Sequence, residues 1–506
     1  MLHFKRAYQY LLIPVLLFCS NAHAIDIESP LRNLIQTSNL GDTQYSITVK
    51  DLDYNQYLAQ INSELLLMPA SNMKLLTTAA SIDILGTDFV FGTELRLIEN
   101  ENGNLPSLII KGDGDPAFCD PILLREHNLG IEDILDMWIK AIVDSGQTHF
   151  QNLYLDDRIF DYQLTHPDWE KNDLLNHYGA EISGLNFYLN CIDVTPIPSR
   201  YLAQEPRVLI FPDAPFLTTS NRAKTGKHDR FWISRPPDRN ELTFHGTVKN
   251  AFTKPVQITV HEPAIFFSRY LISELTKRNI TVDQIVRPDI IDALPTGKVL
   301  HVIRTTLPLV LARTNQDSVN LYAESLFKRI GNKITGEPGS WNNGAAAMRY
   351  FLRNLVGPTA STAQISDGSG LSRSNRISSN MIVQLLSSMY EDPEKMDMYR
   401  ESLAYAGKTN LNERQAAGTL RKRFRDLNKG HWVFGKTGYL TGVVTVSGYY
   451  IYPSPQNPEI SRTIAFSFLF NNVKPPVQAY QIKNLQDKMI SKIQNALLME
   501  ERVNSN

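Results

Sequence analysis

The sequence predicts an α/β (α+β) protein whose main domain is interrupted by a long β-rich insertion. Three short motifs follow one another along the 506 residues: Ser71-Asn-Met-Lys74, Ser318-Val-Asn320 and Lys436-Thr-Gly438. The first motif opens an apolar helical run, and β-rich runs follow the third. About two hundred residues, roughly 89 to 299, separate the first motif from the second and alternate between apolar and polar positions. A chain of this length accommodates two or three domains.

The N-terminus has the pattern of a secretory signal peptide, predicted over residues 1–24. Lys5 and Arg6 precede an apolar stretch at 10–18, and Ala22-His-Ala24 offers a cleavage site. The apolar stretch is too short to span a bilayer as a permanent helix. We therefore expect a secreted protein.

The first part of the main domain, predicted at 25–88, carries a candidate nucleophile. Strand-like runs at 44–51 and 56–61 precede a helix expected over 75–85, which places Ser71 near a helix N-terminus. Free N–H groups there favour developing negative charge. Lys74 shares a helix face with Ser71 and can take its proton, provided that burial or a nearby cation lowers the lysine pKa. Lys436 is a candidate for that cation.

Each short motif recurs in the chain, so its context must identify the functional copy. A second Ser-x-x-Lys begins at Ser325, and a second Lys-Thr-Gly begins at Lys224. Ser325 falls inside a helix that is expected to begin near Ser318, so we interpret it as an ordinary helix residue. Lys224 lies in a polar segment and is expected on a solvated surface loop.

The inserted region, predicted at 89–299, is expected to be β-rich and separately folded. Its strand-like segments are 95–97, 108–110, 208–211 and 256–260. The insertion contains both cysteines of the mature chain, Cys119 and Cys191. They form either a disulfide or two buried thiols.

The second part of the main domain, predicted at 300–506, contributes the other two motifs. Ser318 and Asn320 are expected to supply a proton relay and an amide for a substrate backbone. The segment 432–434 reads as an edge strand beside which an extended peptide pairs, and Gly438 is expected to leave room for that peptide. Runs at 443–452 and 463–470 predict antiparallel neighbours. The C-terminal apolar positions have helical spacing and are expected to pack on this sheet rather than on a membrane surface: Ile482, Leu485, Met489, Ile493 and Leu497.

Composition excludes several other classes of function. A formal net charge of −1 gives no argument for nucleic-acid binding. The histidines lack zinc-ligand spacing, and we find no glycine-rich phosphate loop. We therefore expect neither a metal nor a cofactor.

Several longer blocks, in order, carry a family resemblance: 68–79, 112–116, 156–180, 315–324 and 367–373. With these blocks the chain resembles the class C low-molecular-mass penicillin-binding proteins, the D-alanyl-D-alanine carboxypeptidase/endopeptidase family. The resemblance implies a transpeptidase/β-lactamase-like catalytic domain whose insertion forms two small domains. It also implies a periplasmic enzyme, with at most peripheral membrane contact, that cleaves D-alanyl peptide bonds in peptidoglycan stem peptides or cross-links.

The resemblance also implies roles for individual residues. Ser71 attacks the carbonyl and Lys74 accepts the proton, while backbone N–H groups of Ser71 and Tyr439 hold the oxyanion. Lys436 and Thr437 bind the substrate carboxylate, and β-lactams act as covalent inhibitors. One departure stands out, because the family usually has Thr or Ser where this chain has Tyr439. Tyr439 keeps the backbone N–H for the oxyanion but lacks the small hydroxyl that would face the terminal carboxylate. The change therefore disfavours carboxypeptidase action on a free terminal D-alanine and leaves the assignment of the nucleophile unaffected.

A further block bears on specificity. Asp173 and Tyr178 lie in a segment similar to the family's substrate-contacting segment, and Arg373 ends the last block. Asp173 suits an ammonium and Arg373 a carboxylate, which together match the zwitterionic side chain of diaminopimelate. The alternative is that both are ordinary surface or structural charges. Two other functions remain open from sequence, a serine β-lactamase and a non-catalytic relative that binds wall peptides.

Overall fold

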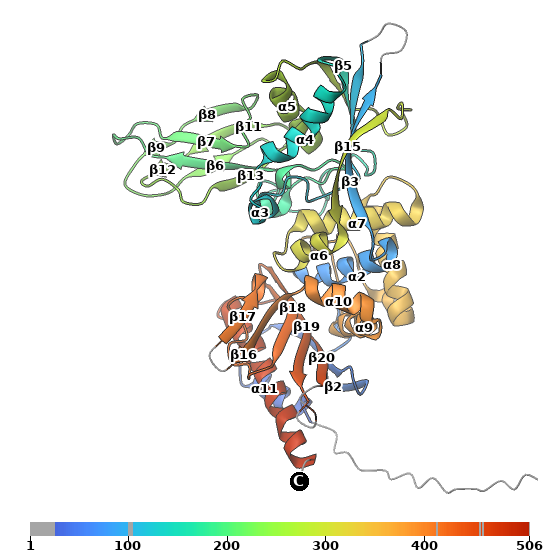
Figure 1. The fold of residues 1–506 in the computed structure, drawn as a ribbon. Coiled ribbons are helices and arrows are strands. Elements are labelled where there is room, and N and C mark those ends of the chain that lie inside the picture. Colours follow the sequence, from blue (N-terminus) through green and yellow to red (C-terminus); the bar gives the residue numbers. More distant parts are fainter. Residues whose placement is uncertain (1–25, 100–104, 411–412, 455–456, 458–459, 505–506) are drawn as a thin grey trace, which may run out of the picture.

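The computed structural model describes residues 26–99, 105–410, 413–454, 457 and 460–504. The predicted signal peptide lies outside these residues. Figure 1 shows two parts, a lower one that contains the first and last portions of the chain and an upper one formed by the middle of the chain. None of the helices in the described ranges combines the length and the hydrophobicity needed to cross a bilayer.

The lower part is built on a seven-stranded sheet in the order β17-β16-β18-β19-β20-β1-β2. Every pair of neighbouring strands in this sheet is antiparallel. The predicted antiparallel pairing of the runs at 443–452 and 463–470 is confirmed, and the two predicted strands that precede the first motif join the same sheet. Their bounds are β1 Gln44–Asp51, β2 Gln56–Ile61, β16 Ala404–Asn410, β17 Glu413–Ala417, β18 Trp432–Leu440, β19 Val443–Pro453 and β20 Ser461–Asn471.

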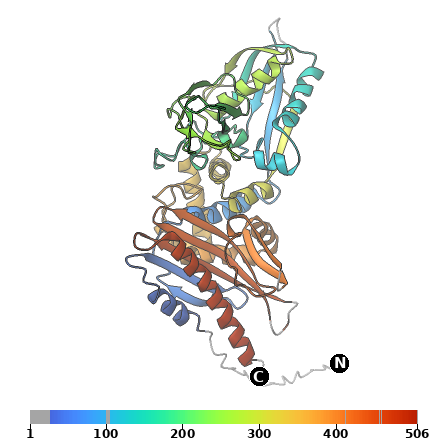
Figure 2. The same cartoon turned by 90° about the vertical axis from the view of Figure 1, so that its left-hand side faces the viewer.

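Successive side chains of a strand point to opposite faces of a sheet, and both faces of this sheet are apolar. Helices therefore cover both faces. In β19, Tyr449 packs in the cluster of the motif-bearing helices, whereas Tyr450 packs in the cluster of the terminal helices. On the first face α9 Ser379–Glu391 lies directly against β1, β19 and β20. The other helices of the same hydrophobic cluster pack around it or around one another: α2 Met73–Leu85, α6 Leu307–Asn315, α7 Asn320–Thr335, α8 Trp341–Val356 and α10 Pro393–Ser402. The second face carries α1 Glu28–Gln36 and α11 Ala479–Asn504 (Figure 2). The five apolar side chains predicted for the C-terminal helix are buried in this second cluster, which confirms that the helix packs on the sheet.

The inserted part contains a mixed five-stranded sheet in the order β14-β5-β4-β3-β15, with smaller sheets beside it. The large sheet consists of β3 Val90–Ile98, β4 Ser107–Lys111, β5 His149–Asp156, β14 Thr281–Val286 and β15 Lys298–Thr306. The small sheets comprise β6 Cys191–Ile197, β7 Arg207–Phe211, β8 Thr218–Asn221, β9 Lys224–Thr225, β10 Trp232–Ser234, β11 Glu241–His245, β12 Thr247–Val248 and β13 Val256–Thr259. One hydrophobic cluster runs through both groups of strands.

The insertion is less purely β than the alternation indicates. It also contains α3 Pro121–Glu126, α4 Ile131–Asp144 and α5 Pro263–Thr276, which the sequence analysis did not anticipate. Helix α4 is amphipathic, and its apolar side, which includes Trp138, is buried against the large sheet. Cys119 and Cys191 are both buried free thiols, so the disulfide alternative is wrong. Strand β15 pairs with β3 along its length up to Thr306, beyond the predicted boundary at 299.

Strand β18, which carries the third motif, differs from the expected edge strand. Its first half pairs with β16, from Trp432 opposite Gly407 to Gly435 opposite Ala404. Its second half, from Lys436 onward, pairs only with β19 within the described part of the chain. The open edge is thus one half of an inner strand, and it begins at the motif lysine.

Candidate active site

Ser71 lies on a tight turn immediately before α2. A 3-10 turn over Ala70–Asn72 precedes the helix, and Ala70 has the left-handed φ of 46°. A residue other than glycine holds such a conformation only where its surroundings fix it, as they often do at functional sites. Ser71 is partly exposed there, whereas the residues on both sides of it are buried. The predicted position at a helix start is confirmed.

Lys74 is fully buried and contacts the Ser71 hydroxyl. Its Nζ lies 3.2 Å from Ser71 Oγ, 2.6 Å from Asn320 Oδ1 and 2.9 Å from the carbonyl oxygen of Ser369. Burial lowers the pKa of Lys74 to about 8, against the opposing effect of the carboxylates of Glu324 and Asp367. A fraction of the amine is therefore neutral near pH 7 and can accept the serine proton.

Lys436 is also buried, and it connects the third motif with the second. Its Nζ donates to Ser318 Oγ over 2.8 Å and to the carbonyl oxygen of Thr437 over 2.9 Å. Burial, and then the charge of Lys74, lower the pKa of Lys436 well below its usual range. The expected role of Lys436 as the cation that depresses the pKa of Lys74 is therefore corrected, since burial is the main cause for both amines. Ser318 itself adopts a left-handed φ of 62°.

Gly438 is needed for a reason other than the expected one. A Cβ atom there would lie 2.2 Å from Thr445 Oγ1, 2.9 Å from the carbonyl oxygen of Pro69 and 3.0 Å from the Ser71 amide nitrogen. The missing side chain therefore lets β18 approach the turn that carries Ser71, rather than making room for a substrate peptide. The contact brings the backbone of β18 beside the N–H of Ser71, as an oxyanion site requires.

A buried carboxylate network supports the contacts of Lys74. Glu324 Oε1 accepts from the backbone N–H of Ser369 over 2.7 Å, and Glu324 Oε2 accepts from Trp341 Nε1 over 2.8 Å. Asp367 accepts from Trp169 Nε1 in the inserted region over 3.0 Å. Burial, followed by the neighbouring Asp367 charge, raises the pKa of Glu324 to about 7.

The sequence analysis assigned no role to Glu324. Helical spacing offered a signal, because Glu324 lies four residues after Asn320 and thus on the same face of α7. The two side chains reach Lys74 by different routes. Asn320 contacts the amine directly, whereas Glu324 holds the residue whose carbonyl oxygen the amine contacts.

A cavity of about 370 Å³ opens in front of Ser71. It brings together most of the predicted site residues, and its lining is Ser71, Glu170, Asp173, Tyr178, Ser318, Asn320, Gly370, Leu371, Arg373, Tyr439, Leu440 and Thr441. The Tyr178 hydroxyl donates to Asp173 Oδ1 over 3.1 Å, and Asn320 Nδ2 donates to the Tyr178 carbonyl oxygen over 2.8 Å. The inserted region therefore forms one wall of the cavity.

Arg373 lies in the same cavity but already has a partner that the sequence analysis missed. Its Nε forms an ion pair with Glu170 Oε1 at 2.9 Å, and its guanidinium donates to the Thr441 carbonyl oxygen over 3.2 Å. The side chains of Arg373 and Glu170 are 40% and 58% exposed, so water weakens this pair. A ligand carboxylate could replace that of Glu170.

Tyr439 and Thr437 lie on the open half of β18. The Tyr439 side chain is 57% exposed, and its ring lies 5.2 Å from Lys483 Nζ of α11. The backbone of Tyr439 pairs with Val444 and remains part of the strand beside the turn that carries Ser71. Thr437 is partly exposed next to Lys436.

The second copies of the motifs lie outside this constellation. Ser325 is buried within α7, and its hydroxyl has no hydrogen-bond partner within the described residues. Lys328 is bound to Asp161 Oδ1 at 2.6 Å and to the Gln163 carbonyl oxygen. Lys224 is exposed as expected, although it forms the short strand β9 rather than a loop. The interpretation of Ser325 as an ordinary helix residue is confirmed.

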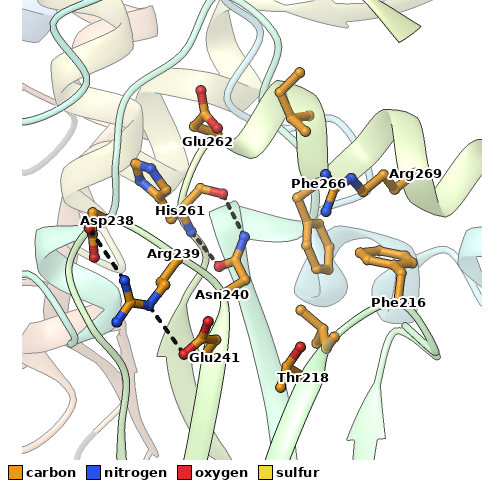
Figure 3. Close-up of a pocket in the computed structure, with 12 residues that line it drawn as sticks. Phe216, Thr218, Asp238, Arg239, Asn240, Glu241, His261, Glu262, Phe266 and Arg269 are labelled. Atoms are coloured by element: carbon orange, nitrogen blue, oxygen red, sulfur yellow. Dashed lines mark hydrogen bonds and ion pairs between the residues drawn. The ribbon is translucent and has the colours of Figure 1, made fainter. Parts of the chain in front are cut away.

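Another polar cavity, of about 260 Å³, is lined only by residues of the insertion (Figure 3). Its charges largely satisfy one another, since Arg239 bridges Asp238 and Glu241, and Asn240 exchanges two hydrogen bonds with the His261 backbone. It contains none of the motif residues. Within the described ranges, no group of three or more His, Cys, Asp or Glu side chains is arranged to hold a metal.

Comparison with known proteins points to one family. Residues 27–495 match the D-Ala-D-Ala carboxypeptidase 3 (S13) family. The chain is 28% identical to a D-alanyl-D-alanine carboxypeptidase of Actinomadura sp. (strain R39) over 92% of this chain and 84% of the relative. It is 25% identical to D-alanyl-D-alanine carboxypeptidase DacB of Haemophilus influenzae over 84% and 85% of the two chains.

Solved structures share the fold. The crystal structure of penicillin binding protein 4 (dacB) from Haemophilus influenzae superposes with a TM-score of 0.74 at 20% identity, covering 92% of this chain and 99% of that one. A second structure of that protein, complexed with a β-lactam, gives a TM-score of 0.69 at 19% identity over the same shares of the two chains. The long insertion is thus part of the shared fold.

Proposed function

The chain belongs to the D-Ala-D-Ala carboxypeptidase 3 (S13) family, and on that premise we propose that Ser71 is the nucleophile of a serine DD-peptidase that acts on peptidoglycan through an acyl-enzyme. The observation that carries the proposal is the buried Lys74 amine, 3.2 Å from Ser71 Oγ with a pKa lowered to about 8. Such an amine is a general base that serves the hydroxyl without a histidine.

Acylation would proceed in the cavity in front of Ser71. Lys74 accepts the hydroxyl proton while Ser71 Oγ bonds to the carbonyl carbon of D-alanine, and the N–H groups of Ser71 and Tyr439 stabilise the oxyanion. The proton then reaches the leaving amine through Ser318, whose hydroxyl lies 2.8 Å from Lys436 Nζ. Water enters after the amine departs and releases the acyl group, which restores Ser71.

Substrate binding would use the open half of β18. An extended peptide can pair with the strand from Lys436 onward, because the pairing of β16 with β18 stops at Gly435. Thr437 and Lys436 suit a carboxylate of the substrate. Tyr439 places no small hydroxyl beside that carboxylate, so we propose that cross-links are cleaved more readily than a free terminal D-alanine.

A labelled penicillin tests the nucleophile. The β-lactam amide imitates the scissile bond, so label should attach to Ser71 and be found there by peptide mapping. Ser71→Ala should lose the label. Ser325→Ala is the matched control, because Ser325 begins the other Ser-x-x-Lys sequence but is buried in α7. Label that persists in Ser71→Ala, or that maps to Ser325, contradicts the assignment.

The lifetime of that adduct distinguishes the peptidase from a serine β-lactamase. A peptidase should hold the penicilloyl group for many minutes, whereas a β-lactamase releases it and turns over. Mass analysis of products from cross-linked muropeptides then separates a working peptidase from a relative that only binds wall peptides. We expect the cross-linked dimer to yield two monomers.

We further propose that the cavity in front of Ser71 recognises the side chain at the third position of the stem peptide. Asp173, oriented by the Tyr178 hydroxyl, suits the ammonium of diaminopimelate, and Arg373 suits its carboxylate. The carboxylate would take the place of Glu170 in the ion pair with Arg373. A periplasmic location fits this substrate and the predicted signal peptide.

A further inference from the structure

A second cavity adjoins the one that contains Ser71. It has a volume of about 640 Å³ and shares three lining residues with the first, namely Tyr178, Ser318 and Asn320. Its remaining walls come from α3, from the small sheet of β6 and β13, and from the segment between α6 and α7. The two cavities therefore adjoin at these three residues, next to the Ser318 hydroxyl.

The acidic groups of this second cavity already have partners. Asp193 accepts from the Tyr188 hydroxyl over 2.9 Å and from Gln257 Nε2 over 3.0 Å. Asp317 forms an ion pair with Arg313 at 2.5 Å. Both carboxylates are therefore satisfied within the protein.

Two basic groups in the lining have no such partners. Arg125 on α3 and Lys254 in the segment before β13 are exposed, and the side chain of neither forms a hydrogen bond or an ion pair within the described residues. Burial lowers the pKa of His177, the other titratable base of the lining, so it adds little positive charge near pH 7. The free charge in the cavity is positive and suits carboxylates.

We propose that this second cavity binds the other peptide arm of a cross-link through carboxylates that Arg125 and Lys254 contact. The inference rests on the proposed function. A cross-link has two peptide arms that meet at the scissile bond. When one arm occupies the cavity with Asp173 and Arg373, the second cavity receives the other arm directly beside Ser318. A monomeric stem peptide has no second arm and leaves this cavity empty.

The test compares a cross-linked dimer with a monomeric stem pentapeptide. The double variant Arg125→Gln/Lys254→Gln should lower kcat/KM for the dimer about tenfold, through loss of two charge contacts that are each weakened by exposure to water. Cleavage of the monomer and acylation by penicillin should stay within about twofold of the wild-type rates. Arg222→Gln/Lys227→Gln is the matched control, because both residues lie on the insertion and line neither cavity, and neither forms an ion pair within the described part of the chain.

A chemically altered substrate identifies the ligand group. A dimer whose second arm carries amidated carboxylates should lose the same factor with the wild-type protein and show no further loss with the double variant. Equal dimer cleavage by wild type and double variant, with penicillin acylation intact, overturns the inference about the cavity alone. A wild-type protein that neither reacts with penicillin nor cleaves either peptide overturns the proposed function itself.

Discussion

Replacing Glu324 with Gln should shift the pH dependence of acylation to lower pH. The carboxylate is buried, and it reaches Lys74 through Ser369, whose N–H it accepts and whose carbonyl oxygen lies 2.9 Å from the amine. Its negative charge favours the protonated amine and so raises the pKa of Lys74. In the proposed mechanism acylation requires the neutral amine, and removal of the charge therefore makes that form available at lower pH.

The expected shift is about one pH unit. A nearby charge moves a pKa by about one to three units, and the lower figure applies because Glu324 acts across Ser369 and because the charge of Asp367 remains in the variant. Glu324 has a pKa of about 7 and Lys74 one of about 8, so the carboxylate is mostly ionised over the range in which the amine titrates. Well above the Lys74 pKa, where the amine is neutral in both proteins, the rates should converge.

The assay is the rate of acylation by a labelled penicillin, measured from acidic to alkaline pH across the Lys74 pKa. Glu337→Gln serves as the control, because Glu337 is exposed just beyond the end of α7. The amide group of the substituted side chain would face backbone and indole donors that now bind a carboxylate, so thermal unfolding of the variant should be measured beside the rates. A rate that falls by one factor at all pH values, with the acidic limb unmoved, would refute the electrostatic reasoning and leave Glu324 a purely structural role.

Three other outcomes follow from the same geometry. Lys74→Arg introduces a guanidinium group, which stays protonated and cannot accept the serine proton, so acylation should fall by at least about a hundredfold. Near-normal rates would show that another group is the base. Asp173→Asn and Arg373→Ala should each depress turnover of diaminopimelate peptides but spare penicillin acylation, and a parallel loss of both activities would contradict recognition. Gly438→Ala should slow acylation at least about tenfold and lower stability by about 1–3 kcal/mol, because its Cβ contacts the nucleophile turn; unchanged acylation kinetics and thermal unfolding would show that the turn tolerates the methyl group.

Much of the sheet could be predicted from the sequence, because alternation of side chains is a local property. The strands Gln44–Asp51 and Gln56–Ile61 have the predicted bounds, and β19 and β20 differ by one or two residues. In the insertion, the same alternation predicted strands but not α4, because the apolar positions of α4 repeat every three to four residues. The register of β16 against β18, which leaves half of β18 open, depends on pairing between distant segments and has no local signal.

The candidate site also combines features that local sequence spacing predicts with features that depend on the packing of distant segments. The pairing of Ser71 with Lys74 follows from helical spacing and needs no tertiary information. The sequence offered burial or a nearby cation as the origin of the low Lys74 pKa, and the choice between them could not be made, because burial depends on how distant elements pack around the amine. Glu170 was missed, and the role of Gly438 was wrongly predicted, for a related reason: each acts on a residue that only the folded chain places beside it.

The two supports of the Lys74 amine impose a limit on how this enzyme could be reduced in size. Asn320 is tethered by the carbonyl oxygen of Tyr178, and the loop of Ser369 is tied through Asp367 to the indole of Trp169. Both anchors belong to the insertion, although all three motifs lie outside it. A minimal enzyme made by joining residue 88 to residue 307 would retain each motif and the seven-stranded sheet, yet it would leave Lys74, the proposed general base, without its fixed surroundings. The insertion thus helps to hold the proposed catalytic residues in place.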